Sequence, residues 1–250
     1  MKKLFMVVIK SLIFNNFPEV VFGFSTKIAA DRKPPFYFNL SYSVGDDERI
    51  VKENRKLFFQ SLGLEENRIV AQKQTHSDIV RYVEKYDGLL ESDGLITDKI
   101  NLGLAVSTAD CTPVFLYDKK NKIISAVHSG WRGTQKKILQ KTLNKLSEEF
   151  ASRAENLIAY LGPSIKQKNY QVGEEVAALF DSKYILKEND KYFLDIPAVN
   201  YEMLLGFGVK NENIEVSSLC TFENNILLHS YRRDGVHSGR SMGAIALKGC

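Results

Sequence analysis

The sequence predicts an α+β (mixed α/β) fold, a single domain over residues 1–250 with a mixed β-sheet and flanking helices. Two observations predict it. Strand-like apolar runs and amphipathic helical segments are interspersed along the chain without strict βαβ alternation. No internal repeat, low-complexity tract or Pro/Ser-rich linker divides the 250 residues, and their hydrophobic content of 44% and charged content of 26% are ordinary globular values.

The first half of the chain is expected to contain an edge strand, one helix and several buried strands. Residues 1–14 superficially resemble a signal peptide, but Lys10 interrupts the apolar run and no small-residue cleavage site follows, so an edge strand is expected. A helix is expected over 48–62, because apolar side chains recur on one face, an aspartate can cap its start, and Gly63 ends it. Buried strands are expected over 104–107, 114–117 and 123–128.

The second half is expected to alternate between helices and strands. A glycine turn after His128 leads into a lysine-rich amphipathic helix with its apolar face on Ile138, Leu139, Leu143, Leu146 and Phe150. Asp195 followed by Pro197 predicts the start of a further helix. The remaining expected elements are a strand over 157–161, a short helix over 173–180, the helix over 196–207, and closing strands over 226–229 and 242–247.

Charge and cysteine usage narrow the classes of function. The net charge is only +4 and no basic stripe with interleaved aromatics appears, so no nucleic-acid partner is expected. No apolar stretch approaches the roughly 20 residues that span a bilayer, so no membrane partner is expected. Three widely separated cysteines argue against a disulfide framework. A cytoplasmic protein is therefore expected.

Three metal-capable side chains stand in polar segments: His76 in QKQTHSDIV, Cys111 in STADCTPVF and His128 in SAVHSGWRGT. Two imidazoles and a thiolate suit Zn²⁺, and three protein ligands leave a fourth position open for water or substrate, as in catalytic zinc sites. Two other interpretations fit the same residues. Cys111 can be a nucleophile with a histidine as its base, or a buried small apolar group beside hydrogen-bonded loop histidines.

Arginines and acids near these segments are candidates for supporting roles. Guanidinium groups close to glycine turns suit bidentate binding of phosphate or carboxylate, and Arg132, between two glycines, is the first candidate. Arg55 lies in the expected helix, where a solvated surface charge is the simpler expectation. The other candidates are Arg232 and Arg233.

Among the acids, Asp110 directly precedes Cys111 and is the preferred catalytic candidate. Asp78 and Asp93 are candidates for orienting a ligating imidazole, although Asp93–Gly94 is also a common turn dipeptide.

Several other chemistries lack their sequence signatures. The chain has four histidines and no His-x-His pair, whereas a multicopper centre needs many imidazoles. The H-x-E…P-C-x-x-C pattern of zinc nucleobase deaminases is absent. Neither a GxxxxGK[ST] loop nor a GxGxxG turn appears.

An ordered set of motifs from about residue 22 to residue 247 resembles a known family. The most specific of them are ADC-x-P and AVH-x-GWRG. With them the chain resembles the laccase-domain or polyphenol oxidase family, which is similar to bacterial purine nucleoside phosphorylases. The set reads GFSTK, VGDD, NR, QTHSDIV, SDGLIT, LAVSTADCTPVFLYD, AVHSGWRGT, LGPSI, YQVGEEV, CTF and SYRRDGVHSGR.

The resemblance implies a fold, a metal site and an activity. It implies a mixed α/β domain whose zinc ligands are His76, Cys111 and His128, with Arg55 beside the metal instead of at the surface. It also implies that adenosine, inosine and methylthioadenosine react with inorganic phosphate to give free base and a sugar 1-phosphate. An adenosine deaminase activity is attributed to such proteins as well. Many relatives read Q-x-H-G and C-L-P, where this chain has Ser77 and Thr112.

Two alternative enzyme classes stay open on the sequence. One is a cysteine hydrolase or amidase, in which Cys111 attacks an amide and His128 is the base. The other is a copper-dependent phenol oxidase, as the family name suggests. Because Cu²⁺ binds most nitrogen and sulfur sites more tightly than Zn²⁺ does, copper in a preparation would be adventitious.

Overall fold

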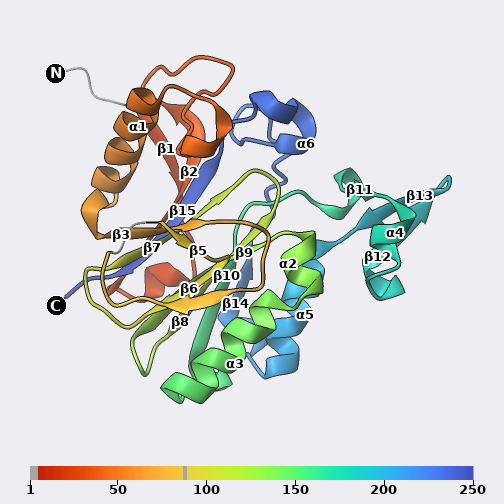
Figure 1. Ribbon diagram of the computed structural model, residues 1–250. Coiled ribbons are helices and arrows are strands. Elements are labelled where there is room, and N and C mark those ends of the chain that lie inside the picture. The colour runs from red at the N-terminus through yellow and green to blue at the C-terminus, as the bar shows by residue number, and fades with distance from the viewer. Residues whose placement is uncertain (1–4, 87–88, 250) are drawn as a thin grey trace.

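Two six-stranded β-sheets form the centre of the molecule, which a computed structural model describes for residues 5–86 and 89–249 (Figure 1). The first sheet has the strand order β1-β2-β15-β7-β3-β5 and the second the order β14-β10-β8-β9-β6-β4. A small third sheet has the order β11-β13-β12. Parallel and antiparallel pairs occur in both large sheets. The predicted α+β class is therefore confirmed, and the division into two large sheets is a feature that the apolar pattern does not indicate.

The strands of the first sheet are β1 (Met6–Ile9), β2 (Val20–Ala29), β15 (Ser241–Leu247), β7 (Gly103–Thr108), β3 (Ile69–Lys73) and β5 (Leu90–Glu91). Those of the second are β14 (Ile214–Val216), β10 (Leu157–Leu161), β8 (Thr112–Asp118), β9 (Ile123–Ser129), β6 (Gly94–Thr97) and β4 (Val80–Tyr82). The small sheet contains β11 (Gln171–Val172), β13 (Lys191–Leu194) and β12 (Ile185–Glu188). The helices are α1 (Glu48–Ser61), α2 (Trp131–Gln135), α3 (Ile138–Phe150), α4 (Glu174–Ala177), α5 (Ile196–Phe207) and α6 (Tyr231–Asp234).

Helices cover the outer faces of both large sheets. Phe58 and Phe59 of α1 pack with Ala105 and Met242 against the first sheet. On the opposite side of the molecule, α3 and α5 cover the second sheet, with one apolar cluster joining both helices to β8, β9 and β10 (Figure 1). The resulting order of layers is helix, sheet, sheet, helices.

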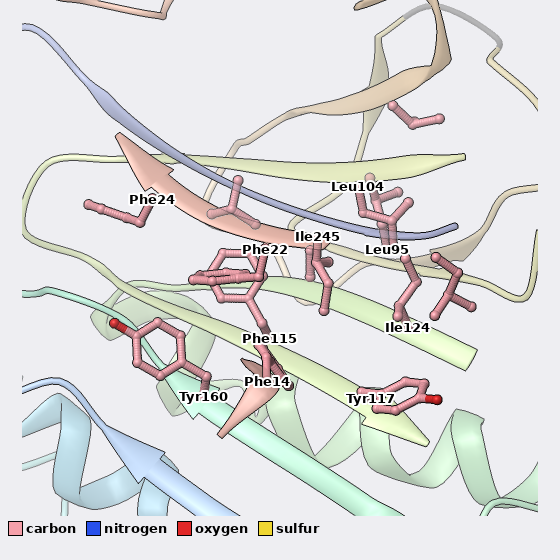
Figure 2. Packing of buried hydrophobic residues seen from close by; sticks show 14 of the residues in the cluster. Phe14, Phe22, Phe24, Leu95, Leu104, Phe115, Tyr117, Ile124, Tyr160 and Ile245 are labelled. Atoms are coloured by element: carbon pink, nitrogen blue, oxygen red, sulfur yellow. The ribbon is translucent and has the colours of Figure 1, made fainter. Parts of the chain in front are cut away.

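The alternation of side chains along β8 separates two cores, because successive residues of a strand point to opposite faces. Val114 and Leu116 pack toward the helices, whereas Phe115 and Tyr117 point toward the first sheet. Figure 2 shows the ring of Phe115 beside that of Phe22 from β2, with ring centroids 4.9 Å apart. Aromatic and aliphatic side chains therefore both contribute to the apolar contact between the sheets.

Most predicted elements are confirmed at or near their expected bounds. Asp47 caps α1 by accepting a hydrogen bond from the Arg49 amide at 2.8 Å, and Gly63 follows the helix with a φ of +70°. Asp195 caps α5 through the Ala198 amide at 3.0 Å. The N-terminal strand lies at the edge of its sheet, as expected.

Two predicted elements differ from the structure. The helix expected over 173–180 is shorter, Glu174–Ala177. The strand expected over 226–229 is wrong, because the Asn224 carbonyl accepts hydrogen bonds from the Leu227 and Leu228 amides and closes a turn there. Ile226 is 76% exposed at this turn. A short apolar run alone does not distinguish a strand from a turn that places one apolar side chain in solvent.

Among the residues that the structure describes, no helix has both the length and the apolar character needed to cross a lipid bilayer.

Candidate metal centre

The structure brings His76, Cys111 and His128 together where the two large sheets meet. His76 follows β3 of the first sheet, Cys111 lies in the turn from β7 of the first sheet to β8 of the second, and His128 belongs to β9 of the second. Their ligand atoms all lie within 4.8 Å of one another, and Cys111 Sγ is 3.9 Å from His76 Nε2. The long gaps in sequence are therefore closed by strand pairing.

The buried carboxylate of Asp93, just before β6, fixes two of these three residues. It accepts hydrogen bonds from the amides of Thr75 and His76, both at 3.2 Å, and from the amide and hydroxyl of Ser77 at 2.6 and 2.7 Å. The Nδ1–H of His128 donates to it at 2.8 Å. His76 has a φ of +56°, a left-handed conformation that these bonds hold in place. Asp93 thereby directs the Nε2 of His128 toward the cluster.

The charges around the cluster favour the anionic forms of its acids. Burial would raise the pKa of Asp93, but hydrogen bonds from His128 and Ser77 lower it to about 2. Burial would likewise raise the pKa of the Cys111 thiol, and the charge and hydrogen bonds of His128 and His76 lower it to about 6. Because the thiolate is the form that binds a metal or attacks an electrophile, the site suits both interpretations of Cys111.

Gly130 packs directly against the cluster. A Cβ at this position would lie 2.8 Å from Cys111 Sγ and 2.9 Å from His76 Cδ2. The φ of Gly130 is −78°, which any residue can adopt. Close approach of the backbone to the sulfur and imidazole therefore explains a glycine here.

Asp110 ties the segment that carries Cys111 to the last part of the chain. One carboxylate oxygen accepts a hydrogen bond from the Thr221 hydroxyl at 2.6 Å, and the other accepts one from the Arg232 amide at 2.6 Å. Both contacts position the turn between β7 and β8. The catalytic role predicted for Asp110 stays a prediction.

The remaining acid and arginine candidates lie in different surroundings. Of the two acids predicted to orient an imidazole, Asp78 forms an ion pair with Lys141 instead. Asp93 is the acid that contacts the histidines. The expectation of a surface charge at Arg55 is wrong: its side chain is 10% exposed and pairs with Glu66 at 2.8 Å. Arg132 is exposed, with its guanidinium 4.2 Å from the ring centroid of Trp131.

The side chains of Arg232 and Arg233 make different contacts. Arg233 binds the carbonyls of Thr221 and Leu228 and pairs with Asp234, so it supports the loop around α6. Arg232 donates from Nη1 to the Gln171 carbonyl at 2.7 Å.

Two residues that sequence reasoning did not single out also lie near the cluster. The half-buried guanidinium of Arg240 interacts electrostatically with Asp110 and Cys111; burial lowers its pKa, and these two anions oppose that effect. Burial, together with the charge of Cys111, raises the pKa of the Tyr170 phenol. Both residues belong to quoted motifs, SYRRDGVHSGR and YQVGEEV, but only the fold brings them to a cysteine more than 50 positions away.

The donors present fit a single metal ion. Two imidazoles and one thiol meet at one point, an acid orients one of the imidazoles, and glycine keeps one side free of a side chain. Of the other two histidines, His229 is buried beside the Phe38 carbonyl, and His237 is exposed. The histidines needed for a group of several copper ions are therefore not gathered here.

Comparison with known proteins identifies the family of this chain. Residues 21–248 match the family described as multi-copper polyphenol oxidoreductase laccase. A purine nucleoside phosphorylase of Bacteroides thetaiotaomicron is 32% identical over 84% of both chains. Purine nucleoside phosphorylase YlmD of Bacillus subtilis is 31% identical over 93% of this chain and 90% of its own.

Solved structures show the same fold. The hypothetical protein YfiH of Bacillus licheniformis superposes with a TM-score of 0.89 at 33% identity, over 97% of this chain and 96% of that one. YlmD of Geobacillus stearothermophilus superposes with a TM-score of 0.88 at 28% identity, over 93% of both chains. Since the match runs over nearly the whole length, the chain belongs to the multi-copper polyphenol oxidoreductase laccase family, several of whose curated members are named purine nucleoside phosphorylases.

Proposed function

We propose that this protein is a zinc-dependent purine nucleoside phosphorylase. It would cleave adenosine, inosine and methylthioadenosine with inorganic phosphate to give the free base and the sugar 1-phosphate. One observation carries the proposal: a cluster of two imidazoles and a thiol, with ligand atoms within 4.8 Å, occurs in a chain whose curated relatives are named purine nucleoside phosphorylases. The free thiol of Cys111 also suits a reducing, cytoplasmic compartment.

Zinc is the ion that the donor set favours. His76, Cys111 and His128 would hold it and leave one position open, the arrangement of catalytic zinc sites. When bound there, Zn²⁺ supplies a Lewis acid that polarises and orients an oxygen of phosphate or sugar. The family description names copper, which by its general affinity order would enter the same site adventitiously.

The residues around the cluster would serve the anionic reactant. In phosphorolysis the bond from the sugar C1′ to the purine nitrogen breaks and a bond from C1′ to a phosphate oxygen forms, while positive charge develops on the sugar. The departing nitrogen takes up the proton that phosphate loses, which gives the free base. Arg132 is exposed beside Gly130, and Arg240 interacts with Cys111 and Asp110, so both offer positive charge for phosphate. Arg55 is a third candidate, although Glu66 and the Leu40 carbonyl already bind its guanidinium.

The direct test combines metal analysis with product analysis. Zinc-loaded protein should release hypoxanthine from inosine in phosphate buffer, and omission of phosphate should abolish the release. Cys111→Ala should lose both zinc and activity, whereas Cys220→Ala, at a buried cysteine outside the cluster, should keep both. Absence of hypoxanthine from fully zinc-loaded wild-type protein would contradict the proposal.

Adenosine deamination is a second use of the same site, in which water attacks C6 of the purine ring and the 6-amino group leaves as ammonia. Its signature is inosine formed from adenosine without phosphate. Loss of this product in Cys111→Ala would assign it to the cluster, and persistence would assign it to a contaminant.

The arrangement also allows a cysteine hydrolase, because Asp93, His128 and Cys111 follow one another as an acid, a base and a nucleophile do in thiol enzymes. This candidate predicts amide hydrolysis that survives a chelator and stops with iodoacetamide. A metal-dependent phosphorylase shows the opposite response to the chelator.

A further inference from the structure

A cavity of about 520 Å³ is lined in part by Trp131, the residue after Gly130. It is bounded by α2, by β11 with the residues that flank it, by α4 and by α6. Its lining includes Trp131, Tyr170, Val172, Val176 and Arg232. This volume is within the range of sites that bind small molecules.

Two aromatic rings and one guanidinium, those of Trp131, Tyr170 and Arg232, line the cavity. Trp131 is the single tryptophan of the chain, and Arg132 stacks over it at 4.2 Å. Tyr170 carries Arg232 over its ring at 5.2 Å, and Arg232 is held in turn by the Gln171 carbonyl at 2.7 Å. Such planar surfaces suit a planar, electron-rich ligand.

Covalent and hydrogen-bonded links join this cavity to the cluster. Trp131 directly follows Gly130, where a Cβ would lie 2.8 Å from Cys111 Sγ and 2.9 Å from His76 Cδ2. The amide of Arg232 donates to Asp110, the residue before Cys111, at 2.6 Å. A nucleoside whose flat base lies in the cavity would therefore have its sugar near the candidate metal position.

We propose that this cavity binds the purine base of the substrate by stacking on Trp131 and Tyr170. This assignment rests on the proposed nucleoside phosphorylase function and deepens it. Neither residue has a role in the chemistry itself; both are binding residues that place the base so that C1′ faces the cluster.

Stacking makes a prediction about specificity. Every purine offers a π face, so recognition by stacking discriminates weakly among bases. Adenosine and inosine, which differ at position 6 of the ring, should therefore depend on Trp131 and Tyr170 to a similar degree. Pyrimidine nucleosides, with a smaller ring, should bind more weakly.

The position of Trp131 allows binding to be measured apart from turnover. Because it is the only tryptophan, the protein's tryptophan fluorescence reports on this cavity alone. Titration of zinc-loaded wild-type protein with hypoxanthine or adenine should give a saturable fluorescence change, and Tyr170→Leu should shift its midpoint to higher concentration.

Kinetics of matched variants complete the test. Trp131→Leu and Tyr170→Leu should each raise KM for inosine and adenosine roughly 10- to 100-fold, with kcat and zinc content changed little. Trp131→Phe and Tyr170→Phe should restore most of the loss, since an aromatic face remains. Tyr184→Leu is the control, because Tyr184 is a half-buried tyrosine outside this cavity that binds Glu202.

The outcomes separate the two proposals. If inosine is cleaved but bases leave the fluorescence unchanged and KM of both leucine variants stays within twofold of wild type, the base subsite is wrong and the phosphorylase stands. If no nucleoside is cleaved yet bases bind with a saturable signal that Tyr170→Leu weakens, the subsite stands and the phosphorylase fails. Absence of both cleavage and binding overturns both.

Discussion

Asp93 is the side chain on which the geometry of the candidate metal centre most depends. Its two oxygens accept from three consecutive amides, from the Ser77 hydroxyl and from the imidazole of His128. An asparagine has nearly the same shape, but it offers one acceptor oxygen and turns its amide donors toward groups that also donate. Asp93→Asn therefore preserves the volume of the side chain but removes hydrogen bonds that orient His76 and the imidazole of His128.

We expect Asp93→Asn to lower zinc affinity about 10- to 100-fold, the usual effect of removing a group that orients a ligating histidine. Competition with a chromophoric chelator measures this affinity. Asp78→Asn is the matched control, since the side chain of Asp78 pairs with Lys141, and this substitution should leave zinc binding unchanged. Equal affinity of Asp93→Asn and wild type would show that other contacts orient His128.

The sequence alone identifies the three candidate ligand residues but not the other side chains that lie near them. His76, Cys111 and His128 can be identified because imidazoles and thiols are scarce in this chain. Arg240 and Tyr170 cannot be identified in this way, because arginine and tyrosine are common in the chain. These two side chains come near Cys111 only through the folding of loops far along the chain. The interpretation of Arg55 as a surface charge failed because a helix has a buried face as well as a solvated one.

At the level of elements, the contact between β15 and β8 sets the spacing of the two sheets. Gly243 of β15 lies under Phe115 of β8, and a Cβ at this glycine would stand 2.3 Å from the ring. Phe115 is fully buried, so the ring cannot swing into solvent. A larger residue at 243 must push the sheets apart or force the ring off its rotamer.

We expect Gly243→Ala to reduce the free energy of unfolding by about 1–3 kcal/mol, the usual cost of overpacking a core. Urea denaturation measures the change. Gly206→Ala, where a Cβ would meet nothing within 4 Å, should be neutral or slightly stabilising. In the double variant Gly243→Ala/Phe115→Leu, the losses of unfolding free energy from the two substitutions should not add, because the leucine side chain relieves the clash with the new Cβ. Strictly additive losses would show that the two residues are not in contact.

Elements with strong local signals were predictable and those without were not. Helix α5 matches its predicted bounds because Asp195 caps it and Pro197 fixes its first turn. The strand predicted over 226–229 is wrong, because an apolar run of four residues carries no turn signal of its own and the Asn224 carbonyl, outside the run, accepts the hydrogen bonds that close the turn. The pairing of strands into two sheets depends on contacts distant in sequence, which periodicity does not encode.

For the molecule as a whole, a buried histidine couples stability to pH. His229 is 2% exposed, and burial lowers its pKa to about 3, with the charges of Lys27 and Arg240 acting in the same direction and the Phe38 carbonyl and Asp234 opposing it. In the unfolded chain a histidine titrates near 6.5. Between these values the unfolded state binds one more proton than the folded state at this residue.

The free energy of unfolding should therefore fall as pH decreases below about 6.5, by up to about 1.4 kcal/mol per pH unit from His229 alone. Urea denaturation at pH 7.5, 6.5 and 5.5 gives the slope. His229→Leu should make the slope less steep, whereas His237→Gln, at an exposed histidine, should not alter it. An unchanged slope in His229→Leu would place the acid sensitivity elsewhere.

The candidate metal centre takes one donor from the loop after β3 of the first sheet, one from β9 of the second, and the third from the turn between β7 and β8. No single sheet and no continuous segment can assemble it, so an ion bound there would bind the folded chain and not the unfolded one. Such an ion at a free concentration one hundred times its Kd adds about 2.7 kcal/mol to the free energy of unfolding. The supply of that ion would then govern how long each copy of the protein survives proteolysis in the cell.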